Sequence, residues 1–257
     1  MPEHQPLTPQ QVHGLRWDRF KDFRHSRHLH WVAITAPEAS RVAAELPLIF
    51  VTDTQGQTQL HALLSLQAQQ NFCLNEHNQW QLDYTPALLR THPFSIQPPK
   101  GGKPTERTLC IDIDSPWVHP QGQNNFFDTK QAQPQLSSSV QEVLNFLKEL
   151  ELHRYKTQQA CNHLAELKLL KPLEFCTLQG TYQGTAYQID EPALNQLKEK
   201  ALFQLRKTGG LALAYTQMIS SHQVRHLQKA SQDHNSPHQD VDLDQVFGEA
   251  SNDTFKF

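Results

Sequence analysis

The longest regular pattern in the chain starts at Ser137, and it constrains the fold more than any other feature. The serines at 137–139 can cap a helix, and apolar residues then recur every three or four positions. The residues in this pattern are Val140, Val143, Leu144, Leu147, Leu150, Leu164 and Leu167. Pro172 stops or redirects the helix, because proline fits poorly inside one. The pattern therefore predicts a long helix at the start of the C-terminal half.

The N-terminal half instead contains short apolar runs separated by turn residues. These runs predict strands at residues 30–35, 46–52 and 60–66, a short helix at 37–45, a turn at 53–56 and a second hairpin at 71–84. Residues 108–113 alternate between apolar and other side chains, which predicts one more strand with a single buried face. We therefore expect a mainly antiparallel sheet in this half.

After the long helix, the sequence predicts a small hairpin and two more helices. Residues 173–178 and 185–189 flank a segment with two glycines, as hairpin strands do. A helix starts after Asp190 and runs to Gly209, and a last helix covers 211–228. The predicted fold class is α+β, with a mainly antiparallel sheet in the N-terminal half and helices plus a small hairpin in the C-terminal half.

The chain divides into one folded domain, residues 1–230, and an acidic C-terminal tail, residues 231–257. The tail begins with linker-like composition and continues with acids interspersed with hydrophobic residues. Phe247, Phe255 and Phe257 are candidate partner-binding residues, because aromatic side chains carry much of the energy of a docked segment. The same side chains can instead fold back on the domain's own sheet, and the sequence leaves both alternatives open.

Charge and hydropathy exclude several classes of partner. The chain has 23 basic and 26 acidic residues and a formal charge of -3, so it has no general attraction for nucleic acid. No segment approaches the roughly 20 apolar residues of a membrane helix, and residues 1–7 lack the pattern of a secretion signal. We therefore expect a cytoplasmic protein without membrane insertion. The sequence makes no prediction of the oligomeric state.

Two ordered motifs resemble one known family. The first comprises Tyr84, Pro86, Arg90, Pro93 and Phe94, and the second comprises Leu109, Asp112, Asp114 and Ser115. Both resemble the central signature of SapC-like proteins, which are named after surface-layer-associated secretion loci. Segments 46–50, 169–173 and 209–221 are also similar to the family pattern, so the resemblance spans roughly residues 10 to 230. It implies an accessory role near envelope secretion or uptake systems and supplies no established activity.

Histidines form the first group of candidate ligand-binding residues. His30 and the earlier His13 fall where the family pattern places histidine. His25 and His28 are close to His30 in the sequence, and in an extended segment His28 and His30 share one face. That spacing suits two metal ligands, and the alternative is a set of surface or hydrogen-bonded histidines.

Asp112 and Asp114 form the second candidate group. They lie two residues apart on a predicted strand, so both carboxylates can face one side and hold a cation or exchange protons. They can equally cap the turn into Ser115. Either carboxylate, or Glu38, can supply the third ligand that a metal site with the histidines needs. We predict no metal or other cofactor, with a divalent metal ion as the alternative.

Aromatic and cationic residues form the third candidate group. Trp80, Tyr84 and Arg90, with Phe94, can stack on a ring or hold a carboxylate in a bidentate fork. Core packing around one hydrogen-bonded arginine is the alternative. The chain contains no GxSxG, HExxH, GxxxxGK[ST] or GxGxxG motif, so the hydrolase, zincin, P-loop and Rossmann interpretations lack their signatures.

These observations favour a non-catalytic cytoplasmic accessory protein that binds a protein or peptide partner associated with envelope secretion or uptake. The alternative is an enzyme or ligand-binding protein for a small amino-acid-like or peptide substrate, with or without a metal ion. That alternative requires several candidate side chains to surround one pocket. They are His13, His30, Arg90, Asp112 and Asp114.

Overall fold

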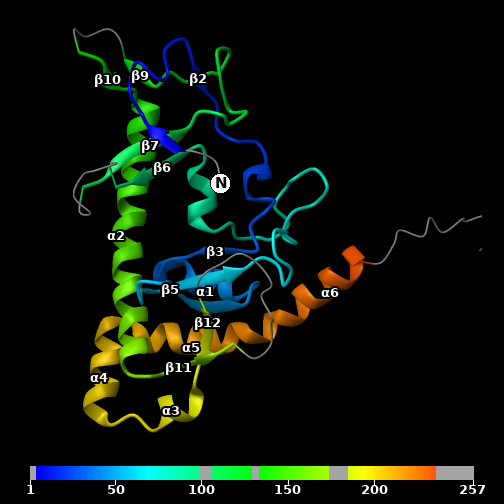
Figure 1. Ribbon diagram of the computed structural model, residues 1–257, viewed down its shortest axis with the longest axis vertical. Coiled ribbons are helices and arrows are strands. Elements are labelled where there is room, and N and C mark those ends of the chain that lie inside the picture. The colour runs from blue at the N-terminus through cyan, green and yellow to red at the C-terminus, as the bar shows by residue number, and fades with distance from the viewer. Residues whose placement is uncertain (1–3, 99–105, 129–132, 174–184, 236–257) are drawn as a thin grey trace, which may run out of the picture.

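The computed structural model describes residues 4–98, 106–128, 133–173 and 185–235 of the 257-residue chain. Two hydrophobic cores lie along one long helix, α2 (Ser138–Glu166), which runs down one side of the molecule (Figure 1). The larger core surrounds a five-stranded sheet, and the smaller core surrounds a three-stranded sheet. The strand pairs of the described residues are antiparallel, and the chain has the predicted α+β fold class.

The larger core is built on a continuous apolar run. β4 (Leu48–Thr52) is the central strand of the order β11-β12-β4-β5-β3, and its first four residues are almost completely buried. Such a run is typical of a strand covered on both faces. β5 (Thr58–Leu63) returns antiparallel beside β4 after the predicted turn at 53–56. The remaining strands are β3 (Trp31–Ala33), β11 (Leu170–Pro172) and β12 (Thr185–Ile189).

The smaller core gathers aromatic residues from distant segments. Trp17, Phe94, Ile111 and Phe126 are among its fully buried side chains. Its sheet has the order β1 (His4–Pro6), β7 (Thr108–Asp112), β6 (Phe94–Gln97). Beside it are two short pairs, β2 (Arg16–Trp17) with β8 (Val118–His119), and β9 (Phe127–Asp128) with β10 (Gln135–Leu136). In chain order, helix α1 (Ala36–Ala43) and the short 3-10 helices η1 (Arg24–Ser26) and η2 (Ala87–Thr91) separate these strands.

Helix α2 confirms the pattern that begins at Ser137. The Ser137 hydroxyl accepts a hydrogen bond from the amide of Val140 and caps the helix, whose 29 residues span about 43 Å. Val140 and Leu147 belong to the smaller core, whereas Leu164 belongs to the larger one. The helix ends just before Lys168, whose φ of 56° is left-handed. One helix therefore supplies apolar side chains to both cores.

The C-terminal helices differ from the prediction in their boundaries. The helix expected after Asp190 is two helices, α3 (Glu191–Asn195) and α4 (Glu199–Thr208), and nothing in the sequence marks the break. Gly209 ends α4 as predicted, with a φ of 82°. The last helix is divided into α5 (Gly210–Ser220), η3 (Ser221–Gln223) and α6 (Val224–Asn235). The expected linker at 231–240 therefore begins as helix.

The two predicted hairpins also differ from the structure. Residues 71–84 form one isolated bridge, from Leu74 to Trp80, instead of two strands. The Asn75 side chain accepts hydrogen bonds from two amides of the turn and closes it without strand pairing. In the C-terminal hairpin β11 pairs with β12 through residues 170–172, earlier than predicted. The expected first strand at 173–178 falls almost entirely outside the described residues.

Gln217 of α5 completes the larger sheet where two strands stop pairing. β12 pairs with β4 through residues 185–187. Next to that pairing, the buried Gln217 side chain accepts a hydrogen bond from Ile189 N (3.0 Å) and donates one to Leu48 O (3.2 Å). The Ser220 hydroxyl accepts a hydrogen bond from Leu48 N at 2.9 Å. Helix α5 thus satisfies strand backbone groups directly, which fixes it on the sheet.

The helix shared by both cores makes a testable prediction. Leu164→Ala should lower the free energy of unfolding by about 2 to 5 kcal/mol, because the residue is completely buried and its removal leaves a cavity. The same change at Leu152, which is 52% exposed on the same helix, should cost less than about 0.5 kcal/mol. Urea unfolding measures both variants. Equal losses would contradict the assignment of the two faces of α2.

Candidate functional site

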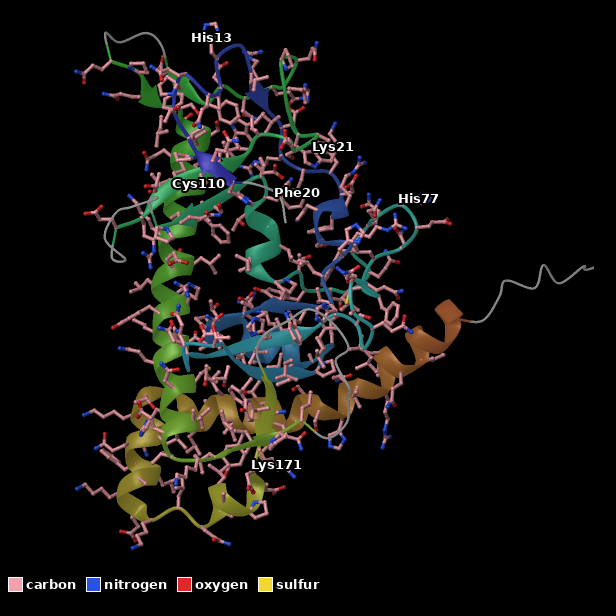
Figure 2. The ribbon with its side chains drawn as sticks, viewed as in Figure 1. His13, Phe20, Lys21, His77, Cys110 and Lys171 are labelled. Carbon is pink, nitrogen blue, oxygen red and sulfur yellow. The ribbon has the colours of Figure 1, made fainter. Side chains whose placement is uncertain are left out.

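The residues expected around one pocket do not meet in one place. They are His13, His30, Arg90, Asp112 and Asp114. Arg90 lines one of three well-formed surface cavities in the described residues, and the other four residues line none of these three. His13 is exposed in a turn at one end of the molecule (Figure 2). Of this set, Arg90 alone lies beside one of these three cavities of the described residues.

The histidine segment is not extended, so its rings diverge. The η1 helix directs His25 towards His92, and the two rings stack with centroids 4.1 Å apart. His28 is exposed, and the His30 ring packs against Trp31 with centroids 4.3 Å apart. Among the residues that the structure describes, no group of three or more His, Cys, Asp or Glu side chains can hold a metal ion.

Asp112 and Asp114 are in different environments. β7 ends at Asp112, which is buried, and the turn that follows leaves Asp114 exposed. Burial raises the pKa of Asp112, while the nearby His4 acts in the opposite direction. Cys110 is buried as well, so β7 is covered on both faces where the alternation predicts one. The alternating sequence pattern reflects only the polarity of neighbouring residues. It cannot predict that other segments of the chain cover the second face of the strand.

Glu38 organises the segment that precedes Arg90. Its Oε1 accepts hydrogen bonds from the Thr35 amide and hydroxyl, and its Oε2 accepts from Ala87 N (2.7 Å) and the Tyr84 hydroxyl (3.1 Å). These bonds satisfy a carboxylate that is only 3% exposed. Burial and the adjacent Glu38 raise the pKa of Tyr84. Trp80 donates from Nε1 to the Tyr84 carbonyl at 3.1 Å, so Trp80 and Tyr84 are held by structural contacts.

Arg90 is held by aromatic rings. Its guanidinium carbon lies 5.7 Å from the Tyr84 ring centroid and 5.5 Å from the Phe146 ring centroid. Its Nη2 also donates a long hydrogen bond, 3.4 Å, to the Tyr84 hydroxyl. In the described parts of the chain no carboxylate is within ion-pair distance of Arg90. A guanidinium has five N–H donors, so this cation keeps hydrogen-bonding capacity for a ligand.

Arg90 borders a cavity of about 370 Å³ formed by three parts of the chain. Segments 17–20 and 90–94 and helix α2 supply its walls. The lining residues are Trp17, Arg19, Phe20, Arg90, Thr91, His92, Phe94, Glu142, Val143 and Phe146. The volume falls within the range of small-ligand sites, which have mostly apolar walls and a few placed polar groups. We call this space the aromatic cavity.

Trp17 lies in the wall of the aromatic cavity and has a buried indole N–H. The side chain is 2% exposed, and its ring packs edge-on against Phe94 with centroids 4.8 Å apart. Its indole Nε1 is buried and has no hydrogen-bond partner among the described residues. An indole N–H can only donate, and buried donors without an acceptor are rare in folded proteins.

A histidine pair beside the aromatic cavity was not identified from the sequence. His92 lines the cavity, and its Nε2 lies 2.7 Å from the Ser115 hydroxyl. Its stacking partner His25 has Nε2 3.1 Å from the Leu89 carbonyl oxygen. Burial lowers the pKa of His92 to about 3, with His25 and His4 adding to the effect, so the ring is neutral at pH 7. The sequence marks His25 in the histidine cluster and places His92 between Arg90 and Pro93 of the first family motif, but it gives no sign that the two rings meet.

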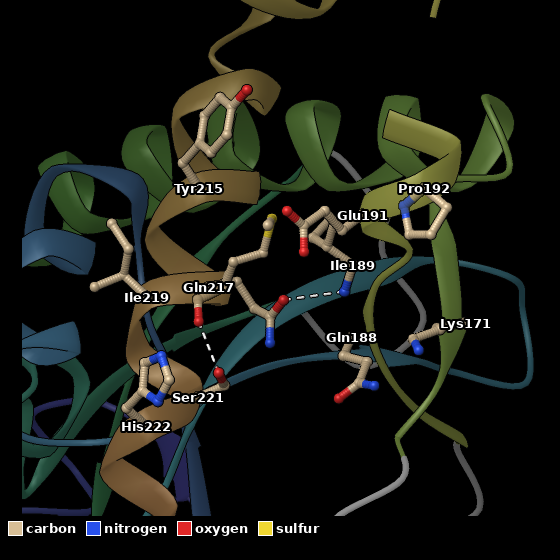
Figure 3. Close-up of a pocket in the computed structure, with 11 residues that line it drawn as sticks. Lys171, Gln188, Ile189, Glu191, Pro192, Tyr215, Gln217, Ile219, Ser221 and His222 are labelled. Carbon is tan, nitrogen blue, oxygen red and sulfur yellow. Dashed lines mark hydrogen bonds between the residues drawn. The ribbon is translucent and has the colours of Figure 1, made fainter. Parts of the chain in front are cut away.

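A second cavity, of about 500 Å³, lies between the sheet and α5 (Figure 3). Lys171 and Gln188 lie on one side of it, and Tyr215 and Ile219 lie on the α5 side. Ile219 is an apolar side chain of α5, yet it is 69% exposed. The Gln217 side chain in this cavity is already bonded to strand backbone. We therefore take the aromatic cavity, with its uncommitted donors, as the candidate site.

The predicted tail anchors Phe247, Phe255 and Phe257 lie outside the described residues, and so does Cys176. The remaining cysteines, Cys73, Cys110 and Cys161, are buried free thiols. In the described part of the chain, no helix has the length and apolar character needed to cross a membrane.

Comparison with known proteins identifies the family. The profile of the SapC family matches residues 7–227, which is most of the chain and includes every residue of the aromatic cavity. The chain therefore belongs to the SapC family, and the resemblance seen in its motifs is confirmed. No curated protein and no solved structure matches the chain.

The lowered pKa of His92 predicts a pH-dependent stability. An unfolded histidine has a pKa of about 6.5. The value for folded His92 is about 3, so between these values the unfolded chain binds the extra proton. The neutral ring's contribution is therefore complete above the unfolded pKa and is lost as the pH falls towards the folded one.

We expect His92→Gln to lose less stability than the unmodified chain when the pH falls from 7 to 5, as measured by urea unfolding. The substituted amide can still hydrogen-bond to Ser115, so the comparison isolates the titration. The matched control is His222→Gln, at an exposed position, which should keep the pH dependence of the unmodified chain. If His92→Gln lost as much stability between pH 7 and pH 5 as the unmodified chain, His92 would not be the source of the pH dependence.

Proposed function

We propose that this SapC-family chain is a non-catalytic cytoplasmic accessory protein that binds a protein or peptide partner. The observation that carries the proposal is the aromatic cavity with Arg90 held at its edge between two rings. Aromatic walls beside a directed cation are typical of the pockets that receive the main anchor of a binding partner. The partner's association with envelope secretion or uptake systems is inferred from the family resemblance.

The shape of the site supports binding of a side chain that projects from a partner. Phe20 and Phe146 are partly exposed walls, whereas Trp17 and Phe94 are buried. A projecting aromatic ring can therefore enter against rings already fixed by packing, and fixed rings lose little conformational freedom on binding. We propose the tail residues Phe247, Phe255 and Phe257 as further anchors on the same partner.

Site-specific photo-crosslinking in the native host tests the proposal. Phe20 is replaced by p-benzoylphenylalanine, which keeps an aromatic ring in the wall of the aromatic cavity. Irradiation should yield one discrete adduct, and mass spectrometry should identify the same partner in repeated experiments. We expect this adduct because a partner side chain bound in the aromatic cavity would contact the ring at position 20.

The control carries the same photoreactive residue at Tyr155, which is exposed on α2 and does not line the aromatic cavity. It should give no such adduct, and equal adducts from both positions would count against the site. A variant with Phe247→Ser, Phe255→Ser and Phe257→Ser separates the tail from the cavity. A severalfold lower yield supports the tail anchors, and an unchanged yield removes them from the proposal.

The second candidate is an enzyme or ligand-binding protein for a small amino-acid-like or peptide substrate. The contact of 2.7 Å between His92 Nε2 and the Ser115 hydroxyl favours it, because a base at this distance can activate a hydroxyl. Ser115 is buried, however, and the low pKa of His92 makes it a weak base. Metal analysis of untagged protein separates the candidates: stoichiometric iron, zinc or manganese would support the enzyme, and we expect only traces.

A further inference from the structure

We infer that the aromatic cavity recognises an aromatic ring that carries a carboxylate next to it. The inference rests on the proposed function, since it concerns the same cavity, and it names the chemistry of the group that binds there. Two sources share this chemistry: a peptide that ends in an aromatic residue, and a free aromatic amino acid. The argument depends on the charge of the lining, the available donors and the walls.

The charge of the lining favours an anion. The aromatic cavity has two cationic side chains, Arg19 and Arg90, and one acidic one, Glu142. Arg19 and Glu142 pair with each other at 3.3 Å. His92 also lines the cavity, and burial keeps its ring neutral at pH 7. The charge left without a counterion in the lining is therefore the positive charge of Arg90.

The form of that charge favours a carboxylate. A guanidinium is flat and presents parallel N–H donors that match the two oxygens of a carboxylate. The contacts with Tyr84 and Phe146 use the π faces of the rings and one long hydrogen bond, so they orient Arg90 without occupying most of its donors. A single uncommitted arginine also suits one negative charge better than the two of a phosphate group.

The walls favour a ring beside that carboxylate. Phe20, Phe94 and Phe146 give the aromatic cavity rings from three segments, and aromatic pairs gain energy beyond their buried area. An aliphatic anion would leave the rings without a stacking partner.

Calorimetric titration of the full-length protein tests the inference. The probes are N-acetyl-Gly-Gly-Phe with a free carboxylate, the same peptide as its C-terminal amide, and free phenylalanine. We expect the peptide acid to bind at least tenfold more tightly than the amide, a difference of about 1.4 kcal/mol. Tighter binding of the peptide acid than of phenylalanine identifies a peptide terminus as the source, and the reverse identifies a free amino acid. Both results support the shared chemistry.

Two matched substitutions locate the effect. Arg90→Gln should abolish the preference for the acid over the amide, because it removes the charge that pairs with the carboxylate. Arg41→Gln is the control: Arg41 lies 5.0 Å from the same Tyr84 ring but does not line the aromatic cavity. It should leave each dissociation constant within twofold. Both arginines are exposed, so both variants are expected to fold.

The inference is overturned if neither acid binds, if the amide binds as tightly as the acid, or if Arg41→Gln weakens binding as much as Arg90→Gln. These failures are distinct from failure of the proposed function. A partner that crosslinks to position 20 while both acids fail to bind would leave the partner-binding function standing without this chemistry. If the acids bind but no partner crosslinks to position 20, the recognition chemistry is supported and the protein-partner function is not.

Discussion

Helix α2 is the element on which the rest of the structure depends, because both cores bury side chains against it. Two polar contacts fix its position on the larger core: Thr157 Oγ1 accepts a hydrogen bond from Ala36 N at 2.8 Å, and Asn162 Oδ1 accepts one from Thr58 N at 2.9 Å. The opposite half of the helix packs in the smaller core and carries Phe146 to the aromatic cavity. Displacement of α2 from either core would therefore move one wall of the cavity.

Glu38 ties the segment before Arg90 to the larger core, and its burial makes its hydrogen bonds necessary. A buried carboxylate is costly unless donors surround it, so the segments that supply those donors are held together. Here the donors come from Thr35, at the start of α1, and from Tyr84 and Ala87, which precede Arg90. The larger core thus sets the position of the cation, while the smaller core supplies most of the rings around it.

The sequence predicts the local elements because their patterns depend on neighbours in the chain. The spacing of apolar residues from Val140 predicts α2, and the run at 46–52 with its turn predicts β4 and β5. Arg90 could be selected as a site residue because it is a cation within the family motif, close in sequence to aromatic residues. Trp17 and Phe146 could not, since they meet only through folding of distant segments. The stacking of His25 on His92 has the same origin, and neither position has a periodic signal.

The cavity is better suited to recognition than to proton transfer, and the reason lies in where its polar groups are placed. A general base works best when its pKa is near the working pH, whereas burial keeps the pKa of His92 far below it. Arg90, by contrast, remains exposed, so its charge stays hydrated until a ligand arrives, and the rings of Tyr84 and Phe146 already set its direction. A cation oriented before binding loses little freedom when an anion pairs with it, which favours affinity over chemistry at this site.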